Sequence, residues 1–192
     1  MIYNITGYGK GKTTSAIGIA CRALYNNEKV LFVQFLKENI DGGVRLLNDC
    51  FEGQFNLLCQ EHKGFNKINC EKFFNEVLDR IKEVEPDLIV LDELNIVLDN
   101  CLLDYPEEAI ETIKNTAPNA DLYITGRINN SVIRHDLMTE ADIASNCFSE
   151  NHSYNAYCTE CKQEFPNRFD YCPHCGSRLE GKKEAVRGRE FW

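Results

Sequence analysis

The apolar residues of this chain gather in short continuous runs. Three runs have the length of a strand: KVLFVQFL at Lys29–Leu36, LIVLDE at Leu88–Glu93 and DLYIT at Asp121–Thr125. Such runs are typical of strands covered on both faces, as in a parallel sheet. Residues Met1–Ile5 form a further short strand pattern that leads into a glycine-rich turn. These four segments predict the centre of a parallel sheet.

Segments with helical periodicity separate the runs. In Glu71–Val84 the apolar residues are spaced for one face of a helix. Lys12–Leu24 has the same character, and Pro106–Asn115 has an early proline and acidic residues in its first turn, both typical of helix N-termini. Weaker patterns predict helices at Gly42–Asn48 and Asn130–Met138 and strands at Gly53–Leu58 and Asp142–Phe148. This alternation predicts an α/β fold, a parallel sheet flanked by helices with right-handed crossovers.

The pattern changes at Tyr154, where the chain becomes polar and rich in cysteine. Cys158 and Cys161 are separated by two residues, and ten residues later Cys172 and Cys175 repeat that spacing. Two such pairs can present four thiolates tetrahedrally to Zn²⁺, and a site of four cysteines is a closed, structural one. An iron site of rubredoxin type and disulfide bonds are the alternatives. We therefore predict a small zinc ribbon near the C-terminus, folded mainly by its metal.

Composition and charge narrow the class of protein. The 192 residues include 21 Lys and Arg against 30 Asp and Glu, a formal net charge of −9. Such an acidic chain is a poor candidate for binding nucleic acid, which needs clustered basic residues. It has no apolar run of about 18 residues, so we expect no membrane span. Ten cysteines without a signal-peptide pattern predict a cytoplasmic protein.

The turn after the first strand has the pattern of a phosphate-binding loop. The motif G-x-x-x-x-G-K-[ST] requires a strand before it and a helix after it, and TGYGKGKT at Thr6–Thr13 has both. Thr6 replaces the first glycine, while Gly7, Gly9 and Gly11 remain to form the turn. Glycines let backbone N–H groups converge on a phosphate beside a helix N-terminus. The alternative is a lysine-rich turn that only caps the helix.

Four side chains would give this loop its charge and its metal ligands. Lys12 supplies a positive charge to the phosphates, and Thr13 offers a hydroxyl to Mg²⁺. Asp92 and Glu93 end a strand, and the carboxyl ends of parallel strands meet at the edge where the loop lies. One of these carboxylates can hold Mg²⁺; a solvated strand end is the alternative. These residues predict a P-loop NTPase-like site but no particular reaction.

Several stretches in order resemble the ATP:corrinoid adenosyltransferases, which act on cobalamin and its precursors. TGYGKGKTT resembles the family's T-G-x-G-K-G-K-T-T, which explains Thr6. The further similar stretches are VLFVQFLK, LIVLDELNIVLDNCLLD, DLYITGR, LMTEADIASN and the terminal AVRGREFW. We therefore predict a nucleotide- and corrinoid-binding domain at residues 1–150, an inserted zinc ribbon at 154–180 and a family-like tail at 181–192.

The resemblance implies transfer of the 5′-deoxyadenosyl group of ATP to the Co(I) of a corrinoid, cobalamin or cobyrinic acid a,c-diamide. Cobalt attacks the ribose C5′ carbon and triphosphate leaves, so the reaction is alkylation and not phosphoryl transfer. Co(I) needs no general base, and the loop and Mg²⁺ would stabilise charge on the departing triphosphate. A flavoprotein electron donor and a homodimer are the partners that the resemblance suggests.

The family's site can be carried over by position. Lys12, Thr13 and Glu93 would act in catalysis, with Thr13 and Glu93 as Mg²⁺ ligands and Asp92 in support. The residues expected to bind ATP or the corrinoid are Thr6, Gly7, Gly9, Lys10, Gly11, Lys12, Thr13, Thr14, Arg22, Phe65, Asp92 and Arg127.

Some of these assignments have alternatives, and the chain departs from the family near the expected corrinoid. Many members have a G-F-T-W segment whose aromatic residues press on the corrin; KGFNK keeps Phe65 but has Lys67 at the Trp position. The stretch GGVRLL lacks the family's acidic residue. A place in the core is the alternative for Phe65, and surface ion pairs are the alternatives for Arg22 and Arg127.

Two other functions remain open from the residues. A thymidine-kinase-like nucleoside kinase also joins a phosphate loop to a four-cysteine zinc module, but its metal strand usually continues D-E-x-Q, whereas Leu94 and Asn95 follow Glu93 here. An ATP-gated module that binds nucleic acid or protein through the ribbon is the third reading. The net charge of −9 and the lack of a basic–aromatic stripe oppose nucleic acid.

Overall fold

Six parallel strands form the centre of the unit Met1–Cys147, and a second unit comprises Phe148–Trp192. The computed structural model describes residues 1–37, 40–60, 66–104, 108–128, 141–147, 154–166, 175 and 177–178. The six strands are β1 (Ile2–Thr6), β2 (Val30–Gln34), β3 (Phe55–Cys59), β4 (Leu88–Asp92), β5 (Asp121–Thr125) and β6 (Ile143–Asn146). Their order in the sheet is β3-β2-β4-β5-β1-β6. The sheet therefore has the doubly wound arrangement in which ligands bind at the carboxyl ends of the strands.

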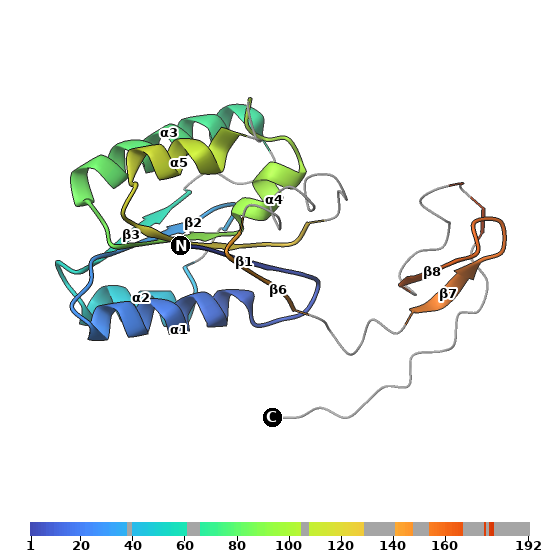
Figure 1. The fold of residues 1–192 in the computed structure, drawn as a ribbon, viewed down its shortest axis with the longest axis horizontal. Helices are drawn as coiled ribbons and strands as arrows, with labels where there is room; N and C mark the ends of the chain where they lie inside the picture. The colour runs from blue at the N-terminus through green and yellow to red at the C-terminus, as the bar shows by residue number, and fades with distance from the viewer. Residues whose placement is uncertain are drawn as a thin grey trace. The chain divides into compact units, whose positions relative to one another are not determined.

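Helices cover both faces of this sheet (Figure 1). On one face lie α1 (Lys12–Tyr25) and α2 (Gly42–Cys50), and on the other lie α3 (Lys67–Val84), α4 (Leu94–Asp99) and α5 (Ala109–Thr116). Asp41 and Asn66 are the N-caps of α2 and α3. Their side chains accept hydrogen bonds from the backbone N–H groups of Gly43 and Asn69, respectively. Such N-caps satisfy backbone donors that a helix leaves without partners.

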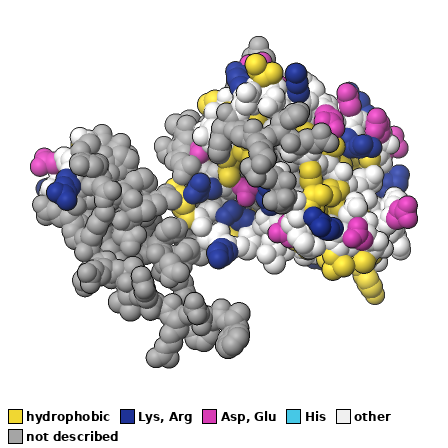
Figure 2. Space-filling model, turned by 180° about the vertical axis from the view of Figure 1, so that it is seen from behind, with side chains coloured by type: hydrophobic (Ala, Val, Ile, Leu, Met, Phe, Trp, Pro, Cys, Tyr) yellow, Lys and Arg dark blue, Asp and Glu magenta, His cyan; other side chains and the backbone are white. Residues whose placement is uncertain are grey.

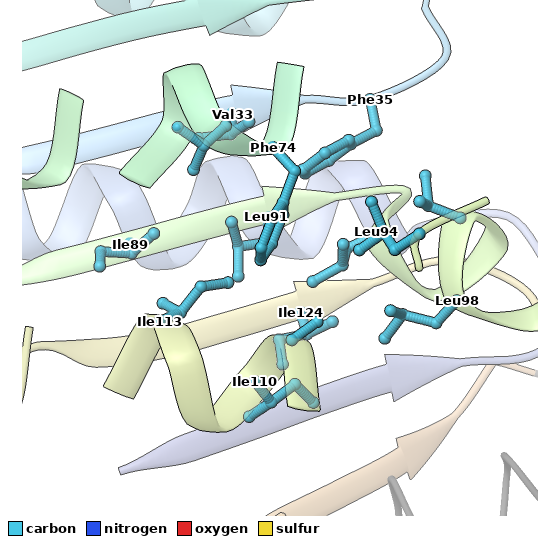
Figure 3. Close-up of a cluster of buried hydrophobic side chains, with 14 of the residues drawn as sticks. Val33, Phe35, Phe74, Ile89, Leu91, Leu94, Leu98, Ile110, Ile113 and Ile124 are labelled. Atoms are coloured by element: carbon cyan, nitrogen blue, oxygen red, sulfur yellow. The ribbon is translucent and has the colours of Figure 1, made fainter. Parts of the chain in front are cut away.

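Two apolar layers form the core, one on each face of the sheet. In β2, Leu31 and Val33 belong to the layer under α3 and α5, whereas Val30 and Phe32 belong to the layer over α1 and α2. Figure 3 shows the first layer, with Phe74 of α3 packed beside Leu91 of β4. Because both faces of each central strand are buried, the strand needs apolar residues at successive positions.

The predicted α/β fold with a parallel sheet flanked by helices is confirmed. The structure differs from the sequence pattern mainly at element ends: α3 already begins at Lys67, and α5 spans Ala109–Thr116, whereas its predicted start at Pro106 lies outside the described residues. Helix α4 did not emerge from periodicity, because it has only 6 residues. The helix predicted at 130–138 lies outside the described residues.

In the second unit, β7 (Tyr154–Cys158) and β8 (Gln163–Pro166) form an antiparallel pair that brings Cys158 opposite Gln163. No helix in the described ranges is long and apolar enough to cross a membrane. On the face of the molecule seen in Figure 2, acidic and basic side chains are interspersed among the described residues.

Candidate nucleotide and metal site

The phosphate loop connects β1 to α1 at the carboxyl edge of the sheet. Gly7 and Gly11 have φ angles of 107° and 106°, in the left-handed region that favours glycine. A Cβ added at Gly7 would lie 2.3 Å from the carbonyl oxygen of Cys147, whereas at Gly11 it would meet no atom within 4 Å. The N–H of Gly9 donates to that same oxygen over 2.8 Å, and the N–H of Cys147 donates to the Thr6 carbonyl over 2.7 Å. The backbone that follows β6 therefore supports the loop.

Lys12 lies against this loop at the start of α1. Its Nζ donates to the carbonyl oxygens of Gly7 and Gly9 over 2.8 and 2.7 Å. Gly11 is the N-cap of α1 and makes no side-chain capping bond, so the helix N-terminus offers backbone donors to an anion. Lys10 and Thr14 are exposed on the same segment. The loop, the ammonium group and the helix end together offer the positive charge and the N–H donors that a phosphate group requires.

Asp92 is the centre of a hydrogen-bond network beside the loop. Its carboxylate is fully buried and accepts the Thr13 hydroxyl, with oxygen–oxygen distances of 3.1 and 3.3 Å. It also accepts Thr125 Oγ1 over 2.7 Å and Gln34 Nε2 over 3.2 Å. The Lys37 ammonium forms an ion pair with Asp92 Oδ2. A buried carboxylate is tolerated when its charge and its oxygens have such partners.

The register of the sheet explains why these side chains meet. Cys59, Gln34 and Asp92 are neighbours across β3, β2 and β4, and Thr125 ends the adjacent β5. Polar residues thus replace the apolar ones in the last position of neighbouring strands. Gln34, Lys37 and Thr125 were not among the predicted site residues. The sequence signal that would identify Gln34 and Thr125 is a polar residue at the end of an apolar strand, and Lys37 lies in the segment after β2.

Glu93 follows Asp92 but takes a different position. It has a φ of 69° as the N-cap of α4, and its backbone N–H donates to Thr125 Oγ1 over 3.1 Å. Its Oε2 atom is buried and has no hydrogen-bond partner in the described part of the chain. Burial, and then the Asp92 charge, raise the pKa of Glu93, while Lys37, Lys12 and Arg127 oppose this. This carboxylate therefore lies among the positive charges of the site.

These oxygen atoms fit a hard divalent cation. Mg²⁺ binds through hydroxyl and carboxylate oxygens and usually keeps several waters. Thr13 and Asp92 are in direct contact, and Glu93 adds a buried oxygen without a hydrogen-bond partner. Asp92 is thus the carboxylate that touches the threonine, although the sequence analysis assigned it a supporting role.

The structure brings only some of the other predicted residues to the loop. The Arg127 guanidinium carbon lies 5.4 Å from the ring centre of Tyr8, a loop residue. Arg22 is exposed in the last turn of α1, about 15 Å along the helix from its first residue. There it lines a cavity with Leu88 and Asp121, which begin β4 and β5. Arg22 therefore lies near the opposite edge of the sheet. Phe65 lies outside the described residues.

A cavity of about 680 Å³ lies beside the edge strand β3 and includes Lys37, the partner of Asp92. Lys37 and Cys59 line it together with Gln60 and residues of α3, among them Asn69 and Phe73. Burial raises the pKa of the Cys59 thiol, an effect that nearby Lys37 opposes. The cavity thus reaches the same ammonium group that pairs with Asp92.

Lys67, at the family's Trp position, forms an ion pair with Asp104 over 2.6 Å.

Three cysteines of the second unit converge. The Sγ atoms of Cys158, Cys161 and Cys175 lie within 4.8 Å of one another, and the Cys161 N–H donates to Cys158 Sγ over 3.4 Å. Hydrogen bonding with Ser177 is the main cause that lowers the pKa of Cys175 to about 6. A thiol with a lowered pKa is readily available as the thiolate that binds metals. Cys172 lies outside the described residues.

Comparison with known proteins identifies the family of this chain. The family model described as "ATP:corrinoid adenosyltransferase BtuR/CobO/CobP" matches residues 1–162. The corrinoid adenosyltransferase of Escherichia coli K12 is 26% identical over 162 residues, which cover 81% of this chain and 80% of that protein. Corrinoid adenosyltransferase CobA of Salmonella typhimurium is 28% identical over 164 residues, with coverages of 81% and 80%. The corrinoid adenosyltransferase of Pseudomonas aeruginosa is 30% identical over 139 residues, with 64% of each chain covered.

Proposed function

This chain belongs to the ATP:corrinoid adenosyltransferase family, and from that premise we propose how its residues carry out the reaction. The enzyme transfers the adenosyl group of ATP to a corrinoid. The relatives give no support to the nucleoside kinase alternative. The observation that carries the assignment of the site is the convergence of Lys12, Thr13 and Asp92 at one phosphate loop.

In the proposed mechanism the triphosphate of ATP binds in the loop as the leaving group. The electron pair of Co(I) forms a bond to the ribose C5′ carbon, and the bond from C5′ to the triphosphate oxygen breaks. Cobalt is thereby oxidised formally to Co(III), and triphosphate leaves with the electron pair of the broken bond. Lys12, whose ammonium lies against the loop, and the N–H groups at the start of α1 would stabilise this charge. We propose that Arg127 assists, and its position beside Tyr8 of the loop supports this.

We assign Mg²⁺ to the oxygens of Thr13 and Asp92, with Glu93 as a further ligand or as a hydrogen-bond acceptor for a bound water. When bound, the ion neutralises charge on the triphosphate. The direct contact of Thr13 with Asp92 and the orphaned Oε2 of Glu93 support this assignment. The chain's own contribution is a rigid arrangement, because Thr125 and Gln34 hold the Asp92 carboxylate in place.

We assign part of the corrinoid to the cavity of about 680 Å³. The cavity is lined both by apolar Leu57 and Phe73 and by the amides of Gln60 and Asn69, which suit an apolar ring edged with amide groups. It adjoins the phosphate site through Lys37, as transfer between the two substrates requires.

A bulky residue in this cavity should interfere with the corrinoid alone. Asn69 is half-buried in the first turn of α3 and lines the cavity. Asn69→Trp should raise the KM for the corrinoid about tenfold, which corresponds to a loss of about 1.4 kcal/mol of binding free energy. The KM for ATP should stay unchanged. Ile68→Trp is the matched control, since Ile68 is 65% exposed on the same turn. Equal corrinoid KM values for both variants would contradict the assignment.

We propose that Zn²⁺ binds to Cys158, Cys161 and Cys175 with Cys172 as the fourth ligand. The convergence of three sulfurs and the N–H···S bond to Cys158 support a tetrahedral thiolate site. Such a metal should supply most of the folding energy of a module this small. We infer a structural role, since four cysteines leave no position for substrate.

Removing one ligand should release the zinc. We expect the wild-type protein to contain about one zinc per chain and Cys158→Ser to contain little, with loss of folding confined mainly to the second unit. Elemental analysis after dialysis measures the metal, and proteolysis measures the loss of folding. Cys101→Ser is the control, because Cys101 is exposed and has no metal spacing. Undiminished zinc in Cys158→Ser would refute this ligand set.

The decisive assay offers reduced corrinoid, ATP and Mg²⁺ without oxygen. We expect a light-sensitive adenosyl–cobalt product together with free triphosphate, from cobalamin or from cobyrinic acid a,c-diamide. A parallel reaction with ATP and thymidine should give no nucleotide product. Formation of only ADP and orthophosphate, with no organocobalt compound, would overturn the proposed function.

We also propose that the enzyme is a cytoplasmic homodimer that receives electrons from a reduced flavoprotein. Family membership supports this proposal, and the net charge of −9 disfavours nucleic acid as a partner. Light scattering after size-exclusion chromatography tests the dimer. Replacement of the chemical reductant by a reduced flavoprotein in the same assay tests the electron donor.

A further inference from the structure

Lys37 lies shortly after β2, beyond Phe35 and Leu36, and its ammonium group lies between two proposed metal ligands. It donates to Asp92 Oδ2 and, over 3.1 Å, to Thr13 Oγ1. The Lys37 side chain is 21% exposed, whereas that of Asp92 is 0% exposed. The positive charge that neutralises the buried carboxylate is therefore a lysine at the border with solvent.

An ammonium group and Mg²⁺ cannot share this place. Mg²⁺ approaches its oxygen ligands to about 2.0–2.1 Å, so its charge would lie within a few ångströms of Nζ. Two positive charges that close repel strongly where burial limits screening by water. Both cations also use the same acceptors, the Asp92 carboxylate and the Thr13 hydroxyl oxygen. Occupation by one therefore requires departure of the other.

We propose that Lys37 is the counter-ion of Asp92 until a divalent cation displaces it. The proposal rests on the metal site assigned above. The Lys37 ammonium also contacts Thr13 in the first turn of α1, so after displacement it stays close enough to pair with a triphosphate bound at the loop. ATP then stabilises the displaced lysine, and nucleotide and metal favour each other's binding. Lys37 thereby acts as a positioning residue that couples the two.

The competition predicts that removing the ammonium group strengthens metal binding. In the absence of nucleotide and corrinoid, Lys37→Met should bind Mn²⁺ about tenfold more tightly than wild type. A tenfold change in affinity is typical of coupling between two sites. The strengthening of Mn²⁺ binding by ATP should shrink in the same variant. Electron paramagnetic resonance of free Mn²⁺ measures both. Lys72→Met is the matched control, since it removes the same charge from the same cavity, and its Mn²⁺ affinity should stay unchanged.

Two further measurements separate competition from a purely structural role. Lys37→Arg keeps the charge, so its Mn²⁺ affinity should stay near that of wild type. If Lys37→Met melts at a lower temperature because Asp92 loses its counter-ion, Mn²⁺ should raise that temperature more than in wild type. Unchanged or weaker Mn²⁺ binding in Lys37→Met would overturn the proposal. Because these experiments contain no corrinoid, that outcome leaves the adenosyl-transfer assay as a separate test of the proposed function.

Discussion

Lys12→Ala should lower the rate of adenosyl transfer by about 100- to 1000-fold. Removing one preoriented hydrogen-bond donor from an oxygen on which negative charge develops has an effect of this size. The Lys12 ammonium already lies against the loop, in contact with the carbonyl oxygens of Gly7 and Gly9. The charge on triphosphate grows as its bond to C5′ breaks, so the loss should appear mainly in kcat. Anaerobic turnover with reduced corrinoid and saturating ATP measures it.

The control for this variant is Lys29→Ala. Lys29 is exposed just before β2, at the edge of the sheet opposite the loop. That variant should turn over at the wild-type rate, which shows that loss of a surface charge alone has little effect. Unchanged melting of Lys12→Ala would establish that its lost rate is not lost folding. Full turnover by Lys12→Ala would refute the assignment of the loop.

Gly7→Ala should be the most destabilising change in the loop. The left-handed φ of 107° costs a residue with a side chain about 1–3 kcal/mol. The new Cβ would also lie 2.3 Å from the Cys147 carbonyl oxygen, and relief of such overpacking typically costs about 1–3 kcal/mol more. We therefore expect a clear drop in the free energy of unfolding, measured in urea. Turnover should fall too, because Gly9 donates to that same oxygen.

Gly11→Ala separates the two causes. Gly11 has nearly the same φ, 106°, but an added Cβ there meets no atom within 4 Å. Gly11→Ala should therefore lose only the free energy of unfolding that the left-handed backbone angle costs. The difference between the two variants then measures the cost of the clash at Cys147. Equal losses of stability would mean that the backbone after β6 moves aside without cost.

The strands and the loop could be predicted from local patterns. The runs that became β2 and β4 are apolar at successive positions because helices cover both faces of the sheet. The phosphate loop needs particular residues at fixed spacing, so Lys12 and Thr13 were identified from the sequence. Cys158 and Cys161 were likewise identified from their spacing in the sequence, and they are two of the three cysteines that converge.

The rest of the site depends on contacts between distant segments. Arg22 belongs to the same helix as Lys12, yet the length of that helix places it near the opposite edge of the sheet. The Asp92 carboxylate contacts Thr13, whereas Glu93 is the N-cap of α4 and its carboxylate makes no such contact with Thr13 among the interactions of the described residues. Successive residues at a strand end point in different directions, so adjacency in the sequence could not tell the two carboxylates apart.

By itself the sequence determined the type of fold, the phosphate loop with Lys12 and the family resemblance, because these reside in short segments with their own periodicity and spacing. Only the tertiary structure decided that Gln34, Lys37 and Thr125 converge on Asp92. Strand register and crossover connections place the ends of β2, β4 and β5 side by side. The partners of a buried charge are set by that long-range pairing and not by neighbours along the chain.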